Sequence, residues 1–237
     1  MINKNTIIIF DVDGTVTEQR RPLTKEMKDL LLKLSLEYKI AFLGGGNYRR
    51  LYNQLDGIQL LVAGNYGLEV GINGKIISKD IVCSWSKGML RHMGVVCDYI
   101  REDYGYTDII GESFEVHPSG MVTLPLLGTK APQELKDIFD MDKKKRKIVL
   151  PELQELLPEF NVIIGGTNSF DILPLGIDKC HGVTVVQSYL GLHDIFYVGN
   201  DFEEGCNDNA IAKKGLPYLN VTSIMVTKNF IKFLLGG

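Results

Sequence analysis

The chain has 237 residues, of which 45% are hydrophobic and 23% charged, and its formal net charge is −3. This composition is typical of a globular protein and excludes the strongly basic field that nucleic-acid-binding proteins carry. No apolar stretch approaches the ~20 residues that a membrane-spanning helix needs, so we expect neither nucleic acid nor a membrane as a partner. The four cysteines have no CxxC spacing, which indicates reduced thiols and a cytoplasmic location.

Strands and helices alternate in the first part of the chain. Ile7–Phe10 is a continuous apolar run, mainly β-branched, that is typical of a buried strand. The next expected elements are a helix over 24–38 that begins at Thr24 and includes Leu36 in its apolar stripe, a strand over 39–43, a short helix through Leu51 and Leu55, a strand over 60–63 and a hairpin over 68–77. This order predicts right-handed βαβ units and a parallel sheet.

From about Val82 the pattern changes to long helices and paired strands. The expected elements are a helix over 85–104, strands over 113–117 and 120–124, helical structure up to about 158 and strands over 161–165 and 169–173. We therefore expect an α/β fold, with a Rossmann-like core formed by residues 1–81 and 177–237 and an inserted α+β cap over 82–176. The charge run at 142–147 is expected to be a solvated loop or helix start.

Two carboxylates, Asp11 and Asp13, follow the first strand two residues apart. The period of a strand directs both to the same side, into the crevice where open α/β sheets bind ligands. Gly14 permits a sharp turn there, and Thr15 adds a hydroxyl for a ligand anion. Close carboxylates are costly unless a cation shares the site, so the pattern favours Mg²⁺ and phosphate chemistry over an ordinary polar turn.

Three further features stand in suitable places along the chain. Gly44–Asn47 follows the second strand and offers backbone N–H groups to phosphate oxygens. Lys179 opens a helix directly after the inserted unit, where its charge can balance a phosphorylated aspartate. A later loop with Asn200, Asp201 and Asp208 supplies oxygens for a Mg²⁺ octahedron. Together these features predict a phosphoryl-transfer centre.

The order of DxDGT, glycine-rich loop, inserted cap, lysine and Gly-Asn-Asp…Asn-Asp loop resembles the haloacid dehalogenase (HAD) superfamily, in the type with a C2 α+β cap. More narrowly, the chain is similar to the eukaryotic-type phosphomannomutases over nearly its full length. The stretches that carry this resemblance include Phe10–Thr17, Leu23–Met27, Ser169–Asp171, Asp178–Lys179 and Gly205–Asp208.

The resemblance implies that Asp11 is the nucleophile, that Asp13 is the general acid/base and that Lys179 pairs with the aspartyl-phosphate. It implies a bound Mg²⁺ with ligands drawn from Asp11, the Asp13 carbonyl, Asn200, Asp201 and Asp208. The phosphate-binding residues implied are Gly14, Thr15, Gly45, Gly46 and Asn47. The substrate-binding residues implied are Arg20, His117, Lys130, Ser169 and Asp171. The expected partner is a small phosphorylated substrate, a sugar phosphate, and a homodimer through the cap is compatible with the resemblance.

The chain also departs from the family's pattern. Gly46 stands where the family has a serine, and Asn200 replaces an aspartate of the metal loop. In the cap, His117-Pro118 and Thr129-Lys130 stand where the family has two arginines that grip the distal phosphate. Histidine or lysine is a weaker replacement for a bidentate arginine.

Three functions remain open on this basis. The missing arginines narrowly favour a Mg²⁺-dependent phosphatase that acts on a phosphosugar or another small phosphometabolite. The alternative is a phosphomannomutase that interconverts mannose 6-phosphate and mannose 1-phosphate, with Lys130 and His117 as the distal anion site. A non-catalytic binding protein is disfavoured, because the aspartates and the lysine of the expected site are all present.

Overall fold

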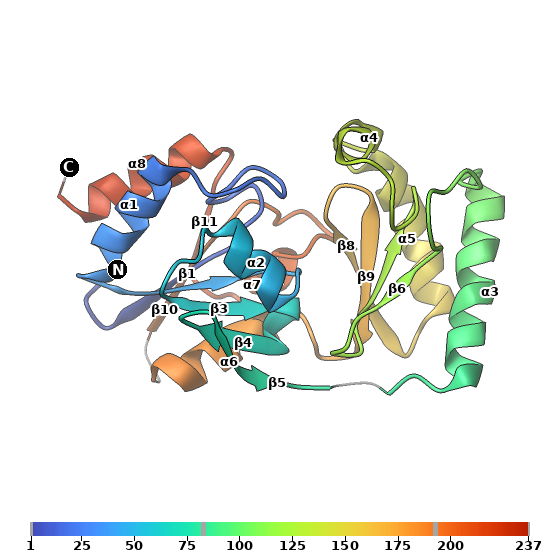
Figure 1. Ribbon diagram of the computed structural model, residues 1–237, viewed down its shortest axis with the longest axis horizontal. Coiled ribbons are helices and arrows are strands. Elements are labelled where there is room, and N and C mark those ends of the chain that lie inside the picture. Colours follow the sequence, from blue (N-terminus) through green and yellow to red (C-terminus); the bar gives the residue numbers. More distant parts are fainter. Residues whose placement is uncertain (1, 82–83, 192–193, 237) are drawn as a thin grey trace. The chain divides into compact units, whose positions relative to one another are not determined.

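The computed structural model describes residues 2–81, 84–191 and 194–236, and it has a mixed α/β fold (Figure 1). The chain divides into two units, Met1–Asp80 with Asp178–Gly237 and Ile81–Ile177, which we call the core and the cap. None of the helices in the described ranges combines the length and the hydrophobicity that crossing a membrane requires. The division of catalysis and substrate specificity between the two units stays a prediction.

The core is built on a seven-stranded sheet with the order β11-β10-β1-β2-β3-β4-β5. The parallel strands are β1 (Thr6–Phe10), β2 (Lys39–Leu43), β3 (Leu61–Gly64), β10 (Asp194–Gly199) and β11 (Tyr218–Asn220). β4 (Glu69–Ile72) and β5 (Lys75–Lys79) extend the β3 edge as an antiparallel hairpin. The mainly parallel sheet predicted from the sequence is confirmed, and β1 lies between β10 and β2.

Helices cover both faces of the core sheet. They are α1 (Lys25–Ser35), α2 (Tyr48–Gln54), α6 (Lys179–Leu190), α7 (Asn209–Lys213), α8 (Ile224–Leu234) and the short 3₁₀ turn η1 (Asn65–Gly67). Alternate residues of β1 point to opposite faces of the sheet. Ile8 and Phe10 pack in the hydrophobic cluster with α1, α2 and α8, whereas Ile7 and Ile9 pack in the cluster with α6 and α7. Burial on both faces explains why the run Ile7–Phe10 in this strand is apolar.

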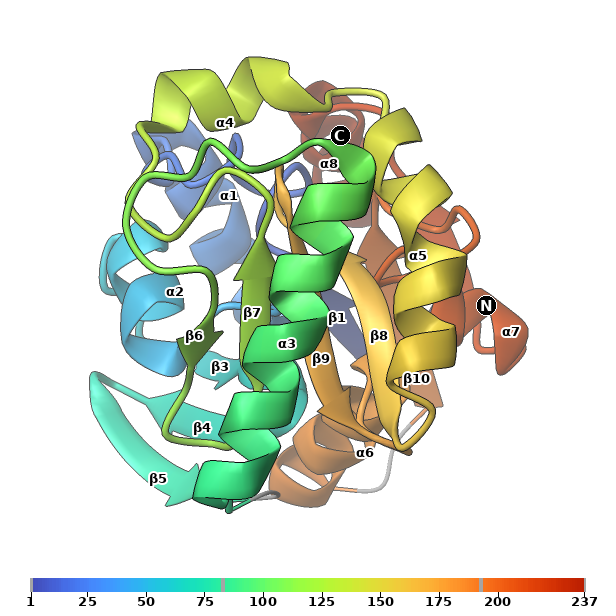
Figure 2. The same cartoon turned by 90° about the vertical axis from the view of Figure 1, so that its right-hand side faces the viewer.

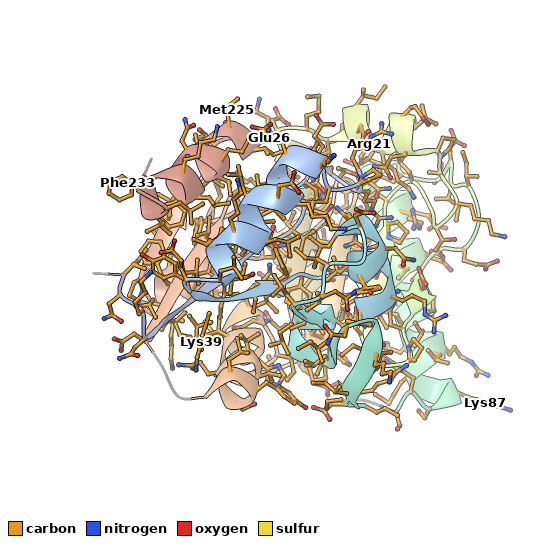
Figure 3. All side chains as sticks on the ribbon, turned by 60° about the vertical axis from the view of Figure 1, so that its left-hand side comes forward. Arg21, Glu26, Lys39, Lys87, Met225 and Phe233 are labelled. Atoms are coloured by element: carbon orange, nitrogen blue, oxygen red, sulfur yellow. The ribbon has the colours of Figure 1, made fainter. Side chains whose placement is uncertain are left out.

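Helix α1 begins as predicted, because the Thr24 side chain accepts a hydrogen bond from the N–H of Met27. The expectation for Leu36 is wrong: it is the C-cap residue and is 86% exposed. It lies two residues beyond the buried Leu34, and a helix turns roughly 100° per residue, so its side chain points away from the core. Glu26 of α1, which is labelled in Figure 3, forms an ion pair with Lys228 of α8.

The cap contains a four-stranded antiparallel sheet with the order β6-β7-β9-β8. Its strands are β6 (Glu115–Val116), β7 (Val122–Pro125), β8 (Phe160–Gly165) and β9 (Ser169–Pro174), and its helices are α3 (Lys87–Tyr104), α4 (Gln133–Phe139) and α5 (Lys144–Leu156). Helices α3 and α5 lie side by side over one face of this sheet (Figure 2). The strands fall within or beside the segments expected from the sequence.

The charge run at 142–147 lies at the start of α5 and is exposed or half-buried, as expected, except for Arg146. Its side chain is 1% exposed, and its Nε donates to the carboxylate of Asp140 at 2.8 Å. Its Nη1 donates to the carbonyls of Gly165 and Gly166, both at 2.9 Å. The helical period places Arg146 on the same face of α5 as the buried Val149. Charge pairing and hydrogen bonds together offset the cost of burying this side chain, and they fix the β8–β9 turn to the start of α5.

Replacing Asp140 by alanine is expected to destabilise the cap by roughly 3–5 kcal/mol, because it leaves a buried guanidinium without its counter-charge. Urea unfolding followed by hydrogen exchange of cap peptides measures this change. The matched control is Asp98→Ala, which removes an exposed carboxylate of α3 and should leave cap stability nearly unchanged. Equal effects of the two substitutions would contradict this account of Arg146.

Candidate active site

The predicted site residues of the core follow the carboxyl ends of strands that neighbour one another. Asp11 and Asp13 come directly after β1, Gly44–Asn47 comes after β2, and the loop with Asn200 and Asp208 comes after β10. These strands are parallel and adjacent in the sheet, so their carboxyl ends share one edge. Ligands bind at this edge in open α/β sheets.

Lys179 is the first residue of α6 and is completely buried. Its Nζ donates to the Asp11 carboxylate at 2.5 Å, to the Leu43 carbonyl at 2.9 Å and to the Tyr197 hydroxyl at 2.9 Å. Since an ammonium group has three N–H donors, these contacts use all of them. Asp11 and Lys179 are 168 residues apart in the chain, and the structure brings them together.

The charges around Lys179 do not balance one another. Asp11 and Asp208 both lie near its ammonium group, the second at 3.4 Å, so two buried carboxylates face one cation. Burial raises the pKa of Asp11 to about 7, against the lowering effect of Lys179, and Asp208 raises it further. Burial lowers the pKa of Lys179, but the two carboxylates outweigh it and the net shift is upward. The cluster therefore has the excess negative charge that a bound cation would neutralise.

Asp208 organises the loop after β10. Its carboxylate accepts hydrogen bonds from the Tyr197 hydroxyl at 2.7 Å and from the backbone N–H groups of Asn200 and Asp201 at 3.1 and 3.0 Å. A Cβ on Gly199 would lie 2.4 Å from this carboxylate, so the close approach requires glycine there. Asp208 thus holds the loop in place, and its oxygens are already engaged.

Few carboxylates in this region are available as oxygen ligands for a metal ion. Within the described residues, no group of three or more His, Cys, Asp or Glu side chains is arranged to hold a metal ion. The Asn207 side-chain oxygen is buried in the loop after β10 and has no hydrogen-bond partner among the described residues. Asn200 accepts a hydrogen bond from the Thr15 hydroxyl at 3.0 Å and packs against Gly14, whose φ is +82°. Neutral amide oxygens therefore accompany Asp11 at this edge.

Asp13 is held by a network that the sequence analysis does not include. Its carboxylate accepts hydrogen bonds from Arg50 Nη2 at 3.0 Å, Gln54 Nε2 at 2.7 Å and the backbone N–H of Arg20 at 2.7 Å. Burial raises the pKa of Asp13, but Arg50 and these hydrogen bonds outweigh it, and the net shift is downward. Arg20 therefore reaches the site through its backbone, and Asp13 is kept as a carboxylate.

The second loop leads into helix α2, whose Arg50 and Gln54 contact Asp13. Asn47 is the N-cap of α2, and its side-chain oxygen accepts from the N–H of Arg50 at 2.9 Å. Gly45 and Gly46 are half-buried just before it, at the end of β2. The binding of phosphate by these three residues stays a prediction.

Arg50, Gln54 and Tyr197 are the residues of this region that the sequence analysis missed. Arg50 and Gln54 are four residues apart on α2, so they share a helix face directly after the glycine loop. That spacing is a signal for a joint role. Tyr197 stands on β10 between Lys179 and Asp208, where burial and the neighbouring Asp208 raise its pKa well above its usual range. Its hydroxyl is the only polar side-chain group in the stretch Ile195–Val198.

Three of the predicted cap residues cluster on the cap sheet. His117 Nε2 lies 2.9 Å from the hydroxyl of Thr123, which donates to the Asp171 carboxylate at 3.2 Å. Ser169, two residues before Asp171 on β9, is buried and donates to the Gly165 carbonyl at 3.0 Å. Lys130 is exposed. The joint role of His117 and Lys130 as a distal anion site stays a prediction.

Comparison with known proteins identifies the family of this chain. A family model described as "Eukaryotic phosphomannomutase" matches residues 27–216. The chain belongs to this family. Phosphomannomutase 2 of Dictyostelium discoideum is 29% identical over 219 residues, which cover 85% of this chain and 87% of that protein.

The solved structures that resemble the chain show its fold. IMP-bound, N-terminally truncated IMP-nucleotidase of Plasmodium falciparum has a TM-score of 0.67 at 13% identity and covers 98% of this chain and 68% of that chain. A haloacid dehalogenase-like hydrolase from Bacteroides thetaiotaomicron has a TM-score of 0.57 at 13% identity and covers 97% and 99%. The fold is that of the HAD superfamily. The phosphomannomutase relatives support the alternative function of the sequence analysis better than its phosphatase interpretation.

Replacing Tyr197 by phenylalanine is expected to lower the free energy of unfolding by about 1–3 kcal/mol, because it leaves Asp208 and Lys179 each short of one buried hydrogen-bond partner. Urea unfolding measures the change. Tyr189→Phe removes the hydroxyl of a tyrosine that is 43% exposed and serves as the matched control. If Tyr197→Phe has no greater effect than this control, the hydroxyl does not support the cluster.

Proposed function

We propose that this protein acts as a phosphomannomutase, moving a phosphoryl group between mannose 6-phosphate and mannose 1-phosphate by way of Asp11. The observation that carries the proposal is the family match, which spans the second loop, the cap and the loop after β10. The buried Asp11–Lys179 pair supports it, because phosphoryl transfer needs a nucleophile and a fixed cation beside it.

In this proposal the Asp11 carboxylate attacks a phosphorus of a hexose bisphosphate and forms an aspartyl-phosphate, while the bond from that phosphorus to the sugar oxygen breaks and the oxygen takes a proton from Asp13. Its backbone N–H donates to the Val198 carbonyl at 2.8 Å, which fixes the residue between β1 and β10. Lys179 already donates to one Asp11 oxygen, so it orients the carboxylate and offsets negative charge as the phosphoryl group arrives. The three partners of its ammonium group hold that charge in place.

Asp13 is proposed to move the proton in each half of the reaction. Its lowered pKa keeps it as a carboxylate, the form that accepts the proton of the attacking sugar hydroxyl. In the opposite direction, the same oxygen returns the proton to the leaving sugar oxygen. Arg50 and Gln54 fix its position from α2.

The donor set fits a bound Mg²⁺. Mg²⁺ typically takes one or two protein carboxylates and fills its octahedron with water and substrate phosphate, so the absence of a three-carboxylate cluster within the described residues is compatible with it. We propose Asp11, the Asp13 carbonyl and amide oxygens of Asn200 and Asn207 as its holders, with Asp201 as a further candidate. Asp208 holds this loop in place by accepting hydrogen bonds from the backbone N–H groups of Asn200 and Asp201. When bound, the ion would neutralise phosphoryl charge.

The cap is proposed to bind the sugar. His117, Thr123 and Asp171 form a hydrogen-bonded group of donors and acceptors on β7, β9 and the end of β6, which suits sugar hydroxyls. A cytoplasmic location and a homodimer through the cap remain predictions.

A phosphatase of the same substrates is the second candidate, because a specific observation favours it. A mutase must hold one phosphate remotely while it exchanges the other, and His117 is hydrogen-bonded within the Thr123–Asp171 group. Neither His117 nor Lys130 supplies the bidentate contact of an arginine. Hydrolysis does not require that a second, remote phosphate be bound.

Replacing Asp11 by asparagine is expected to reduce turnover by roughly three orders of magnitude or more, since the amide cannot form the covalent intermediate. Both isomerisation of mannose 1-phosphate and release of inorganic phosphate are measured, with Mg²⁺ and with EDTA. Asp29→Asn, at an exposed position on α1, is the matched control and should keep full activity. Turnover that survives Asp11→Asn would contradict the proposed role.

The ratio of the two products distinguishes the two candidate functions. We expect isomerisation of mannose 1-phosphate, started with a hexose bisphosphate activator, to be at least tenfold faster than phosphate release (roughly 1.4 kcal/mol in favour of transfer to sugar). The measurement follows both products in one reaction by ³¹P NMR. Phosphate release that exceeds isomerisation would favour the phosphatase instead.

A further inference from the structure

The guanidinium of Arg50 fills the space that a side chain at position 46 would need. A Cβ on Gly46 would lie 2.0 Å from Arg50 Nη2 and 2.2 Å from Nε. Carbon and nitrogen atoms that are not bonded do not approach so closely, so this placement of Arg50 requires glycine at 46. In the sequence alone, Gly46 amounts to the loss of a hydroxyl, whereas the structure places a cationic side chain in the same volume.

Arg50 is held in this place by side chains of its own helix and of the first loop. Its Nη2 donates to Asp13 at 3.0 Å, and its Nη1 donates to the side-chain oxygen of Gln54 at 2.8 Å. Gln54 in turn donates to Asp13 and to the Thr17 hydroxyl, both at 2.7 Å. The guanidinium is therefore oriented before any ligand binds, which reduces the entropy lost on binding.

Part of the guanidinium remains available to a ligand. The Arg50 side chain is 28% exposed, and its Nε has no hydrogen-bond partner among the described residues. The group lies against both Asp13 and Gly46, and so against the two loops that follow β1 and β2. The exposed part of this guanidinium can bring its positive charge to a phosphate oxygen while Nη2 keeps its contact with Asp13.

We propose that Arg50 binds the phosphate group of the substrate, as the donor from α2 that replaces a hydroxyl at position 46. This inference rests on the proposed function, since it assigns a further contact to the phosphate monoester bound beside Asp11. A guanidinium carries a full positive charge, which a neutral hydroxyl lacks. Gly46 and Arg50 then form one unit, because a side chain at position 46 would displace the guanidinium from its present place.

The test is a double-mutant cycle on the full chain, read by calorimetric titration with inorganic phosphate in the presence of Mg²⁺. Arg50→Met is expected to weaken phosphate binding roughly 10- to 100-fold, the range of a charge-assisted hydrogen bond. Gly46→Ser is expected to weaken binding to a similar degree, because it displaces the guanidinium. The double variant should bind no more weakly than Arg50→Met, since the serine has no arginine left to displace. Arg49→Met, an exposed arginine of the same helix, is the matched control and should change nothing.

The outcomes separate this inference from the proposed function. Weaker phosphate binding in Arg50→Met supports the inference, whether or not the wild-type protein turns over mannose phosphates. Unchanged phosphate affinity overturns it, even where the wild type is active, and Arg50 would then only position Asp13. Additive effects of Gly46→Ser and Arg50→Met also contradict it. Failure of the wild type to bind phosphate overturns the inference, whereas the proposed function is decided by isomerisation of mannose 1-phosphate. If Arg50→Met does not fold, Arg50→Gln removes the charge and retains a hydrogen bond to Asp13.

Discussion

The burial of the Lys179 ammonium group is the constraint on which the rest of the candidate site depends. A fully buried cation costs several kcal/mol unless every donor is satisfied, and its partners come from three neighbouring strands: Asp11 from the end of β1, Leu43 from the end of β2 and Tyr197 from β10. One charge therefore sets the relative positions of these strand ends. The nucleophile, the glycine loop and the loop after β10 are placed as a consequence of satisfying Lys179.

Local patterns were sufficient to predict the strands and helices that position the site. The apolar run before Asp11 and the capped helix after Thr24 depend on neighbouring residues, and so they can be read from the sequence. Arg50 and Tyr197 differ in this respect, because their roles depend on groups distant in the chain. A tyrosine in a buried strand has the same sequence pattern as a core aromatic residue. Only in the folded protein do Lys179 and Asp208 lie beside the Tyr197 hydroxyl, which is hydrogen-bonded to both. The burial of Arg146 within an otherwise solvated charge run cannot be read from the sequence for the same reason, since its partners at 165 and 166 lie on another element.

The two units use arginine in different ways. In the cap, Arg101 and Arg146 are buried and direct their N–H groups to backbone carbonyls, which joins strands and turns that would otherwise leave those groups unpaired. In the core, Arg50 stands partly open beside a carboxylate. The cap sheet presents a histidine bonded through Thr123 to an acidic side chain, and that carboxylate weakens the local field for an anion. Neutral hydroxyl groups suit this surface better than a second phosphate.

The position of β1 in the sheet has a consequence for how the protein is made. β1 pairs with β2, which follows it closely in the chain, but its other neighbour, β10, begins only at Asp194. Until β10 is synthesised, the apolar run Ile7–Phe10 has one unpaired edge, the kind of surface that recruits other chains. The whole cap is synthesised during this interval. Val198 of β10, whose carbonyl accepts a hydrogen bond from the Asp11 N–H, is synthesised after it. A nascent chain is therefore exposed to misassociation for most of its synthesis, and chaperone contact with residues 6–10 would be most valuable before the ribosome reaches β10.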